Sequence, residues 1–117
     1  MRGATVVVRR GDEILVLRRT EFHANGDWEW TPPAGVSENG ESAEETAARE
    51  LREETGLELP LTLVRAAEWS LFSADAPHDA AVILSDEHDR YEWISLEEAC
   101  GRCLPALVGD AIREATA

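Results

Sequence analysis

Apolar and polar residues along the first third of the chain follow a pattern that predicts paired strands. Two apolar runs, "ATVVVRR" and "EILVLRRT", lie on either side of Gly11-Asp12. This arrangement is typical of a β-hairpin. A short strand containing Trp30 is expected next, followed by Pro32-Pro33, which favour extended backbone. The N-terminal third is therefore expected to be mostly extended.

Three further strands are expected in the second half of the chain. Residues 59–72 are predicted to form one long strand, because apolar side chains recur there at every second position. The residues of this apolar face are Leu61, Leu63, Ala67, Trp69 and Leu71. The segments "AAVIL" at 80–84 and "RYEWI" at 90–94 are predicted to be two more strands. On this interpretation Trp69 and Trp93 belong to the core, as does Trp30.

A helix is predicted to begin after Ser42 and to run to Thr55. Ser42 and Glu45 have the spacing of a capping box, in which each side chain binds the backbone N–H of the other residue. Gly56 is a natural residue for the position just after the helix. The sequence therefore marks both ends of this helix.

Two more helices are expected near the C-terminus. Ser95 is predicted to cap a short helix, "SLEEA", and a last helix follows Leu104 with Pro105 in its first turn. The expected apolar stripe of the last helix consists of Leu104, Leu107, Val108, Ala111, Ile112 and Ala115. Strands and helices in this order predict one domain over residues 1–117, of mixed α/β or α+β class.

The charge of the chain limits its partners. The net charge is −13, and all eleven basic residues are arginine. Such a surface repels nucleic acid and anionic membranes, so neither is an expected partner. A protein this acidic that handled a phosphate compound would need added positive charge, for which a divalent metal ion is the obvious source. The acidic excess and the absence of lysine have two open explanations, adaptation to high salt and a genome that favours arginine codons.

No signal peptide is visible, and no apolar run approaches the roughly 20 residues of a membrane span. A cytoplasmic protein is therefore expected. Cys100 and Cys103 form a lone C-x-x-C. A zinc site needs about four ligands, and the histidines lie at no recognisable ligand spacing. The favoured interpretation is two reduced thiols at the start of a helix, with a redox or metal role as the alternative.

The helix that follows Ser42 carries an unusual set of carboxylates. Glu50, Glu53 and Glu54 fall within an arc of about 100° at the edge of its buried face. Arg49 is expected to point elsewhere and to pair with Glu45 at i, i+4. Half-buried like charges cost stability unless a cation neutralises them, and hard oxygen ligands suit Mg²⁺ or Mn²⁺. From spacing alone, a metal site and a plain acidic face remain equally open.

The stretch from Gly35 to Leu57 resembles the Nudix box, G-x5-E-x7-R-E-U-x-E-E-x-G-U, where U is aliphatic. The matching residues are Gly35, Glu41, Arg49, Glu50, Leu51, Glu53, Glu54, Gly56 and Leu57, with no mismatch. The preceding Trp30, Pro33 and Ala34 resemble the W-x-x-P-G segment that leads into the box. The later "YEWISLEEA" is also typical, so the likeness covers most of the chain.

The resemblance implies a Nudix-type fold, a mixed β-sheet sandwiched between helices. It implies that Glu53 and Glu54 bind the metal, with Glu50 a further ligand or the base that activates water. Arg49 would orient the carboxylates, and two further groups, Glu41 and the Ala34 carbonyl, would complete the site. Ala34 stands where the family usually has glycine, which would be costly if that position needs a positive φ.

Other candidate site residues lie outside the box. Glu87 is a candidate base or metal ligand, and the alternative is an ordinary acidic residue in a turn. Trp28 is a candidate for stacking on a nucleobase. Arg18 and Arg19 could contact phosphates at the end of a strand, although charges on edge strands are common without function.

The resemblance implies hydrolysis of a nucleoside diphosphate linked to another group, with Mg²⁺ or Mn²⁺ as cofactor. A MutT-like nucleoside triphosphate pyrophosphohydrolase is the first expectation, with a small-molecule nucleotide as substrate. The alternatives are a hydrolase of another diphosphate, such as a nucleotide sugar or a dinucleoside polyphosphate, and a Nudix-like module that binds nucleotide without cleaving it. An acidic structural domain ranks third, and homodimer formation is left open.

Overall fold

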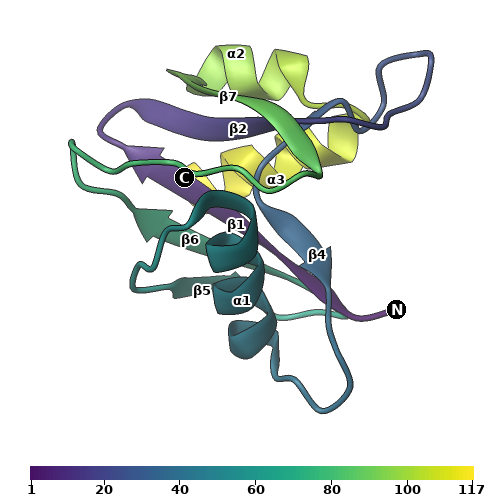
Figure 1. Ribbon diagram of the computed structural model, residues 1–117, viewed down its shortest axis with the longest axis vertical. Helices are drawn as coiled ribbons and strands as arrows, with labels where there is room; N and C mark the ends of the chain where they lie inside the picture. Colours follow the sequence, from purple (N-terminus) through teal and green to yellow (C-terminus); the bar gives the residue numbers. More distant parts are fainter.

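The computed structural model describes all 117 residues, which form one mixed β-sheet of seven strands and three helices (Figure 1). The strands are β1 (Gly3–Arg10), β2 (Glu13–Arg19), β3 (Trp30–Thr31), β4 (Ala34–Val36), β5 (Thr62–Arg65), β6 (Trp69–Asp75) and β7 (His88–Ser95). The helices are α1 (Ala43–Thr55), α2 (Leu96–Arg102) and α3 (Ala106–Thr116). None of them combines the length and the apolar character that a membrane-crossing helix requires.

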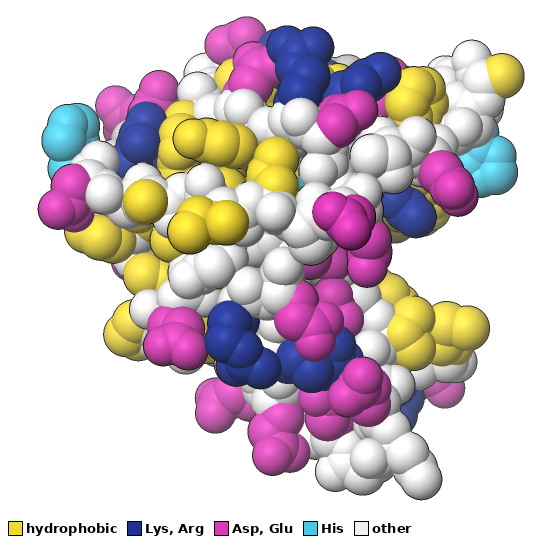
Figure 2. All heavy atoms as spheres, in the orientation of Figure 1, with side chains coloured by type: hydrophobic (Ala, Val, Ile, Leu, Met, Phe, Trp, Pro, Cys, Tyr) yellow, Lys and Arg dark blue, Asp and Glu magenta, His cyan; other side chains and the backbone are white.

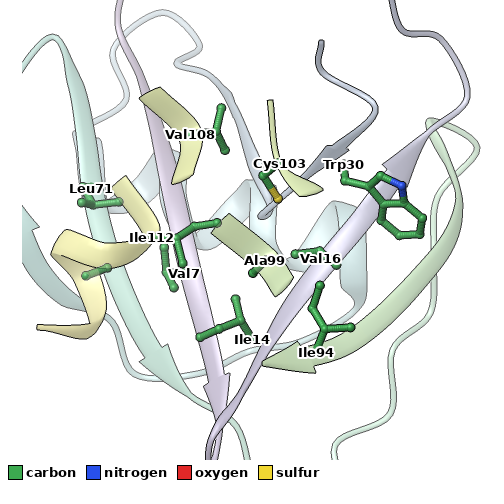
Figure 3. Close-up of a cluster of buried hydrophobic side chains, with 11 residues drawn as sticks. Val7, Ile14, Val16, Trp30, Leu71, Ile94, Ala99, Cys103, Val108 and Ile112 are labelled. Atoms are coloured by element: carbon green, nitrogen blue, oxygen red, sulfur yellow. The ribbon is translucent and has the colours of Figure 1, made fainter. Parts of the chain in front are cut away.

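Helices cover both faces of the sheet, so the central strands are buried on two sides. Successive residues of β1 alternate between two hydrophobic clusters: Val7 belongs to one, and Val6 and Val8 to the other. The first cluster packs against α2 and α3, where Ala99, Cys103, Val108 and Ile112 lie close to β1 and β2 (Figure 3). The second packs against Ala47 and Leu51 of α1. Burial on both faces explains why these strands read as continuous apolar runs. The sandwich confirms the predicted fold class.

The pairing of the strands leaves an opening in the sheet. The main strand order is β3-β2-β1-β6-β5, and β1 runs parallel to β6. β1 and β2 pair only next to their hairpin, at Arg9–Ile14 and Arg10–Glu13. Nearer its start β1 pairs with β4, whereas β2 continues with β3 and β7. The two halves of the sheet therefore separate beside β4.

Several predicted boundaries are confirmed. Gly11 has the left-handed φ of 60° that the tight β1–β2 turn requires. Both hydrogen bonds of the capping box join Ser42 and Glu45, and Gly56 ends α1 with a φ of 74°. α2 begins after Ser95, whose hydroxyl accepts a hydrogen bond from the Glu98 N–H. Local turn and cap chemistry therefore fixes these ends.

The prediction of one strand over 59–72 was wrong. A turn at 66–68 divides the segment into β5 and β6, which pair antiparallel. The Ser70 side chain binds the backbone of Ala67 across this turn. The turn contains no glycine or proline, so the period of two runs across it unbroken. Trp69 is consequently not a core residue, because 38% of it is exposed.

The strand predicted at 80–84 is also absent. This segment has no strand partner, and Ile83 donates its N–H to the Thr55 carbonyl at the end of α1. Ala80, Val82 and Leu84 pack against the α1 side of the core. The apolar run at 80–84 therefore belongs to a loop that lies on the core, not to a strand.

The C-terminal region needs three smaller corrections. Leu104 and Leu107 were expected in the buried stripe of α3 but are 37% and 62% exposed. Trp93 is only partly buried, and its ring packs under the guanidinium of Arg10 at 4.3 Å from the ring centroid. The two cysteines, both free, lie at the end of α2 rather than at a helix start. Burial raises the pKa of Cys103 to about 12.

Candidate active site

A cavity of about 750 Å³ lies between β4, β6 and α3 and reaches the side of α1. α1 and the segment that leads into β7 supply acidic side chains, whereas β6 and α3 supply mostly apolar ones. The polar and charged lining includes Arg19, Glu50, Glu54, Glu87 and His88. The apolar lining includes Trp28, Trp69, Leu71, Leu107 and Val108. Several residues that are distant in the sequence therefore meet at one site.

Glu54 is the most buried carboxylate of the cavity, with 4% of the residue exposed. One of its oxygens accepts a hydrogen bond from the Ala34 N–H at 3.1 Å. Burial raises the pKa of Glu54 to about 9, and the neighbouring carboxylates of Glu50 and Glu87 add to this effect. A buried acid beside two others holds a proton unless a cation replaces it.

Glu50 lies directly over the backbone of Gly35. A Cβ atom at Gly35 would be only 2.1 Å from the Glu50 carboxyl carbon, so any side chain at this position would force the Glu50 carboxylate to move. The preceding residue, Ala34, is in β4 and does not have a positive φ. Alanine therefore causes no backbone strain there, and the departure from the usual glycine is tolerated.

Arg49 lies at the centre of the acidic residues of α1 and of the loop before it. Its Nη1 atom is 2.7 Å from Glu50 Oε1 and 3.2 Å from Glu53 Oε2. Its Nε atom is 2.6 Å from Glu41 Oε2, and its Nη2 atom donates to the Val36 carbonyl at 3.0 Å. In Figure 2, arginine spheres surrounded by acidic ones lie over α1. One guanidinium thus ties three carboxylates to β4.

The expectation that Arg49 points away and pairs with Glu45 was wrong. The carboxylate of Glu45 binds the Ser42 N–H instead, as the capping box requires. Because the guanidinium is free of Glu45, it can turn toward the other carboxylates. A rule based on i, i+4 spacing could not show this, since the arginine reaches residues outside the helix.

Glu41 is bound to Arg49 and does not line the cavity. The Arg49 guanidinium, the Glu38 N–H and the Thr46 hydroxyl all donate to its oxygens. These contacts, chiefly the one with Arg49, lower the pKa of Glu41 to about 2. Glu53 is also outside the lining, with a half-exposed side chain in contact with Arg49.

Glu87, just before β7, and His88, the first residue of β7, both line the cavity. The Glu87 carbonyl accepts a hydrogen bond from the Thr20 N–H at 3.0 Å, which fixes this segment beside the end of β2. Sequence reasoning selected Glu87 but missed His88. His88 is buried, its Nδ1 atom has no partner, and burial lowers its pKa. The one signal in the sequence that could have identified His88 is its position next to Glu87.

The remaining candidates divide into two groups. Arg19 and Trp28 line the cavity, and Trp28 has a φ of 66°, a left-handed conformation that is uncommon for a bulky residue. Arg18 does not line it. The Arg18 guanidinium is 2.9 Å from Glu29 and 2.9 Å from Asp89. Its charge is therefore already neutralised.

Comparison with known proteins agrees with this arrangement, and the NUDIX domain matches residues 1–116. The chain belongs to the NUDIX family. It is 36% identical to the asymmetrical bis(5'-nucleosyl)-tetraphosphatase of Mus musculus over 103 residues, which cover 75% of this chain and 67% of that protein. This Nudix hydrolase is a pyrophosphohydrolase, as the sequence predicted.

Two solved structures resemble this Nudix hydrolase along nearly its whole length. A C. elegans Ap4A hydrolase complex superposes with a TM-score of 0.81 and is 26% identical, covering 98% of this chain and 94% of that one. A MutT protein from Methanosarcina mazei Go1 superposes with a TM-score of 0.77 and is 29% identical, covering 99% and 92%.

The acidic residues of this Nudix site fit a divalent cation by their chemistry. Glu50 and Glu54 are hard oxygen donors, and the buried Glu54 gains most from a neighbouring positive charge. No three acidic, histidine or cysteine side chains are grouped closely enough to hold an ion as they stand. Arg49 forms ion pairs with both Glu50 and Glu53.

Gly35→Ala is expected to displace Glu50 and to lower turnover by about 10- to 100-fold, because groups that position the ligands of a metal have effects of this size. The added Cβ would overlap the Glu50 carboxyl carbon at 2.1 Å. Steady-state kinetics with Mg²⁺ would measure the loss. Gly101→Ala is the matched control, since a Cβ at Gly101 meets no atom within 4 Å. Unchanged turnover in Gly35→Ala would show that Glu50 need not occupy this place.

Proposed function

We propose that this Nudix hydrolase cleaves a pyrophosphate bond in a dinucleoside polyphosphate, such as diadenosine tetraphosphate. One observation carries the proposal. The cavity that contains Glu50, Glu54 and Glu87 continues onto an apolar surface of β6 and α3, and its volume is about 750 Å³. A cavity of this size and mixed lining suits an extended substrate with a polyphosphate and an aromatic group at its end. The names of the mouse and C. elegans relatives support the same substrate class.

Hydrolysis of a nucleoside triphosphate is the second candidate. It was the first expectation from the sequence, and the likeness to the MutT protein of M. mazei favours it. The two candidates share the same pyrophosphate chemistry and differ in whether a second nucleoside is bound. A module that binds without cleaving is less well supported, since the chain keeps every carboxylate of the box.

The acidic residues take distinct roles in this proposal. Glu50, Glu53, Glu54 and the Ala34 carbonyl would hold Mg²⁺ or Mn²⁺. When bound, the metal neutralises phosphate charge and lowers the pKa of water. Glu41 is assigned a positioning role that acts through Arg49, because its oxygens already accept hydrogen bonds from that guanidinium.

Glu87 is the better candidate for the general base. Glu87 and Glu50 both line the cavity, but one oxygen of Glu50 is already bound by Arg49 at 2.7 Å. The Glu87 carboxylate would take a proton from water as the new O–P bond forms and the bond to the leaving phosphate oxygen breaks. Arg19 would meet the phosphates at the end of β2, and Trp28 would border the bound nucleotide.

A substrate panel tests the proposed function. Diadenosine tetraphosphate, ATP, deoxynucleoside triphosphates and a nucleotide sugar would be incubated with Mg²⁺ in low and high salt, and the products separated by chromatography. The expected result is release of AMP and ATP from diadenosine tetraphosphate, with kcat/KM at least about 10-fold above that of the other substrates. Faster cleavage of a triphosphate would favour the second candidate. Tight binding without turnover on any substrate would contradict hydrolysis.

A further inference from the structure

Trp69 lies at the start of β6 and lines the same cavity as Glu50 and Glu54. It is 38% exposed, whereas its neighbour Ser70 is 2% exposed. A large aromatic ring that is partly exposed inside a cavity needs an explanation, because most tryptophan surface is normally covered. The explanation has to account for both its exposure and its place in the cavity that the carboxylates line.

The ring of Trp69 is held in position from two sides. Its Nε1 atom donates a hydrogen bond to Thr5 Oγ1 at 2.8 Å. Its six-membered ring lies against Gly3, where an added Cβ would be 2.4 Å from Trp69 Cζ3. Gly3 and Trp69 are also direct partners in the parallel β1–β6 pairing. The ring is therefore fixed before any ligand binds, so that stacking on it costs little conformational entropy.

Other apolar groups line the cavity with Trp69. Leu107, which is 62% exposed, and Ala111 come from α3. Arg65 of β5 lines the cavity too, but its Nε atom is 3.0 Å from a Glu114 oxygen. This end of the cavity thus offers flat apolar surface without a free charge. A nucleobase fits that chemistry because its faces are apolar and its charge is in the attached phosphates.

We propose that Trp69 binds the base of a nucleoside whose phosphates reach the carboxylates of α1. The proposal rests on the proposed function and deepens it by naming a specificity-determining residue. Trp69 replaces Trp28 as the principal stacking residue, and Trp28 lines the same cavity. Stacking tolerates all bases, so the site is expected to accept different nucleosides and to prefer purines, which have the larger rings.

Binding measurements separate base recognition from catalysis. The probes are AMP and ribose 5-phosphate, which differ by the base, titrated calorimetrically into the full chain with Mg²⁺. The wild type is expected to bind AMP at least about 5-fold more tightly than ribose 5-phosphate. Trp69→Ala is expected to weaken AMP binding by about 10-fold and to leave ribose 5-phosphate binding unchanged. Trp69→Phe, which keeps an aromatic face, is expected to retain most of the AMP affinity.

Leu63→Ala is the matched control, because Leu63 is an exposed apolar residue of β5 that does not line the cavity. It should leave both affinities unchanged. Equal loss of AMP and ribose 5-phosphate binding in Trp69→Ala would indicate a structural role and overturn the proposal. So would a wild type that binds the two probes equally, or a Trp69→Ala variant with wild-type AMP affinity. Because these outcomes are read without turnover, failure of the proposed hydrolysis would be seen separately in the substrate panel.

Discussion

Glu54→Gln is expected to make the metal-free protein more stable near neutral pH while lowering turnover at least about 100-fold. Glu54 is 4% exposed, and burial raises its pKa to about 9 from an ordinary value of 4.5. Glutamine has nearly the same shape. Its oxygen can still accept from the Ala34 N–H, and its amide can donate to Glu50 where two carboxylates now meet. The variant therefore removes a cost of folding along with a candidate metal ligand.

The sign of the pH dependence of stability follows from the upward shift of the Glu54 pKa. Between pH 4.5 and 9 the folded chain holds a proton on Glu54 that the unfolded chain releases. The contribution of this proton to stability is complete below pH 4.5 and is lost as the pH rises toward 9. At about pH 7 to 8 the variant should gain on the order of 1–3 kcal/mol over the wild type without metal, and the gain should vanish at low pH.

Chemical denaturation in EDTA across this pH range would measure the difference in the free energy of unfolding between Glu54→Gln and the wild type. Denaturation at increasing Mg²⁺ concentration would then show how much the ion stabilises each protein. Mg²⁺ should raise the stability of the wild type more than that of Glu54→Gln. Glu53→Gln is the matched control, because its half-exposed side chain should change metal-free stability little. Equal stability of Glu54→Gln and the wild type at about pH 8 would contradict the view that burial of this carboxylate is costly.

The local chemistry of the chain predicted much of the fold. The helix ends at Ser42 and Gly56 are correct because caps depend on a few neighbouring residues. The long strand over 59–72 was wrong because the turn before Trp69 is made by a side chain, not by glycine or proline. The strand at 80–84 was wrong because a short apolar run indicates contact with the core, which a loop can make as well as a strand.

In the candidate site, too, some features could be predicted from the sequence and others could not. The family resemblance selected residues that the fold does bring together, since Glu50, Glu54 and Ala34 line one cavity with Glu87. The direction of the Arg49 side chain could not be predicted, because its partners include the Val36 carbonyl and the loop residue Glu41. His88 and Trp69 were missed for a related reason: their place in the cavity depends on strand pairing between distant segments.

Arg49→Lys is expected to lower turnover by about 10- to 100-fold and to raise the Mg²⁺ concentration needed for half-maximal activity. The planar guanidinium uses all three of its nitrogens: Nε and Nη2 donate to Glu41, Nη1 donates to Glu50 and Glu53, and Nη2 also donates to the Val36 carbonyl. A lysine keeps the charge but has one nitrogen, so it cannot hold all of these groups at once. KM for the substrate should change little, since Arg49 does not line the cavity.

Ser42→Ala separates this positioning role from a general loss of stability. The Ser42 hydroxyl caps α1 by accepting from the Glu45 N–H at 3.1 Å, so its removal should destabilise the helix by about 1 kcal/mol. It should leave turnover and Mg²⁺ dependence unchanged below the unfolding transition. If Arg49→Lys behaves in the same way, losing stability but not turnover or Mg²⁺ dependence, Arg49 only supports the fold. A higher Mg²⁺ requirement confined to Arg49→Lys would instead show that this guanidinium sets the spacing of Glu50 and Glu53 on which cation binding depends.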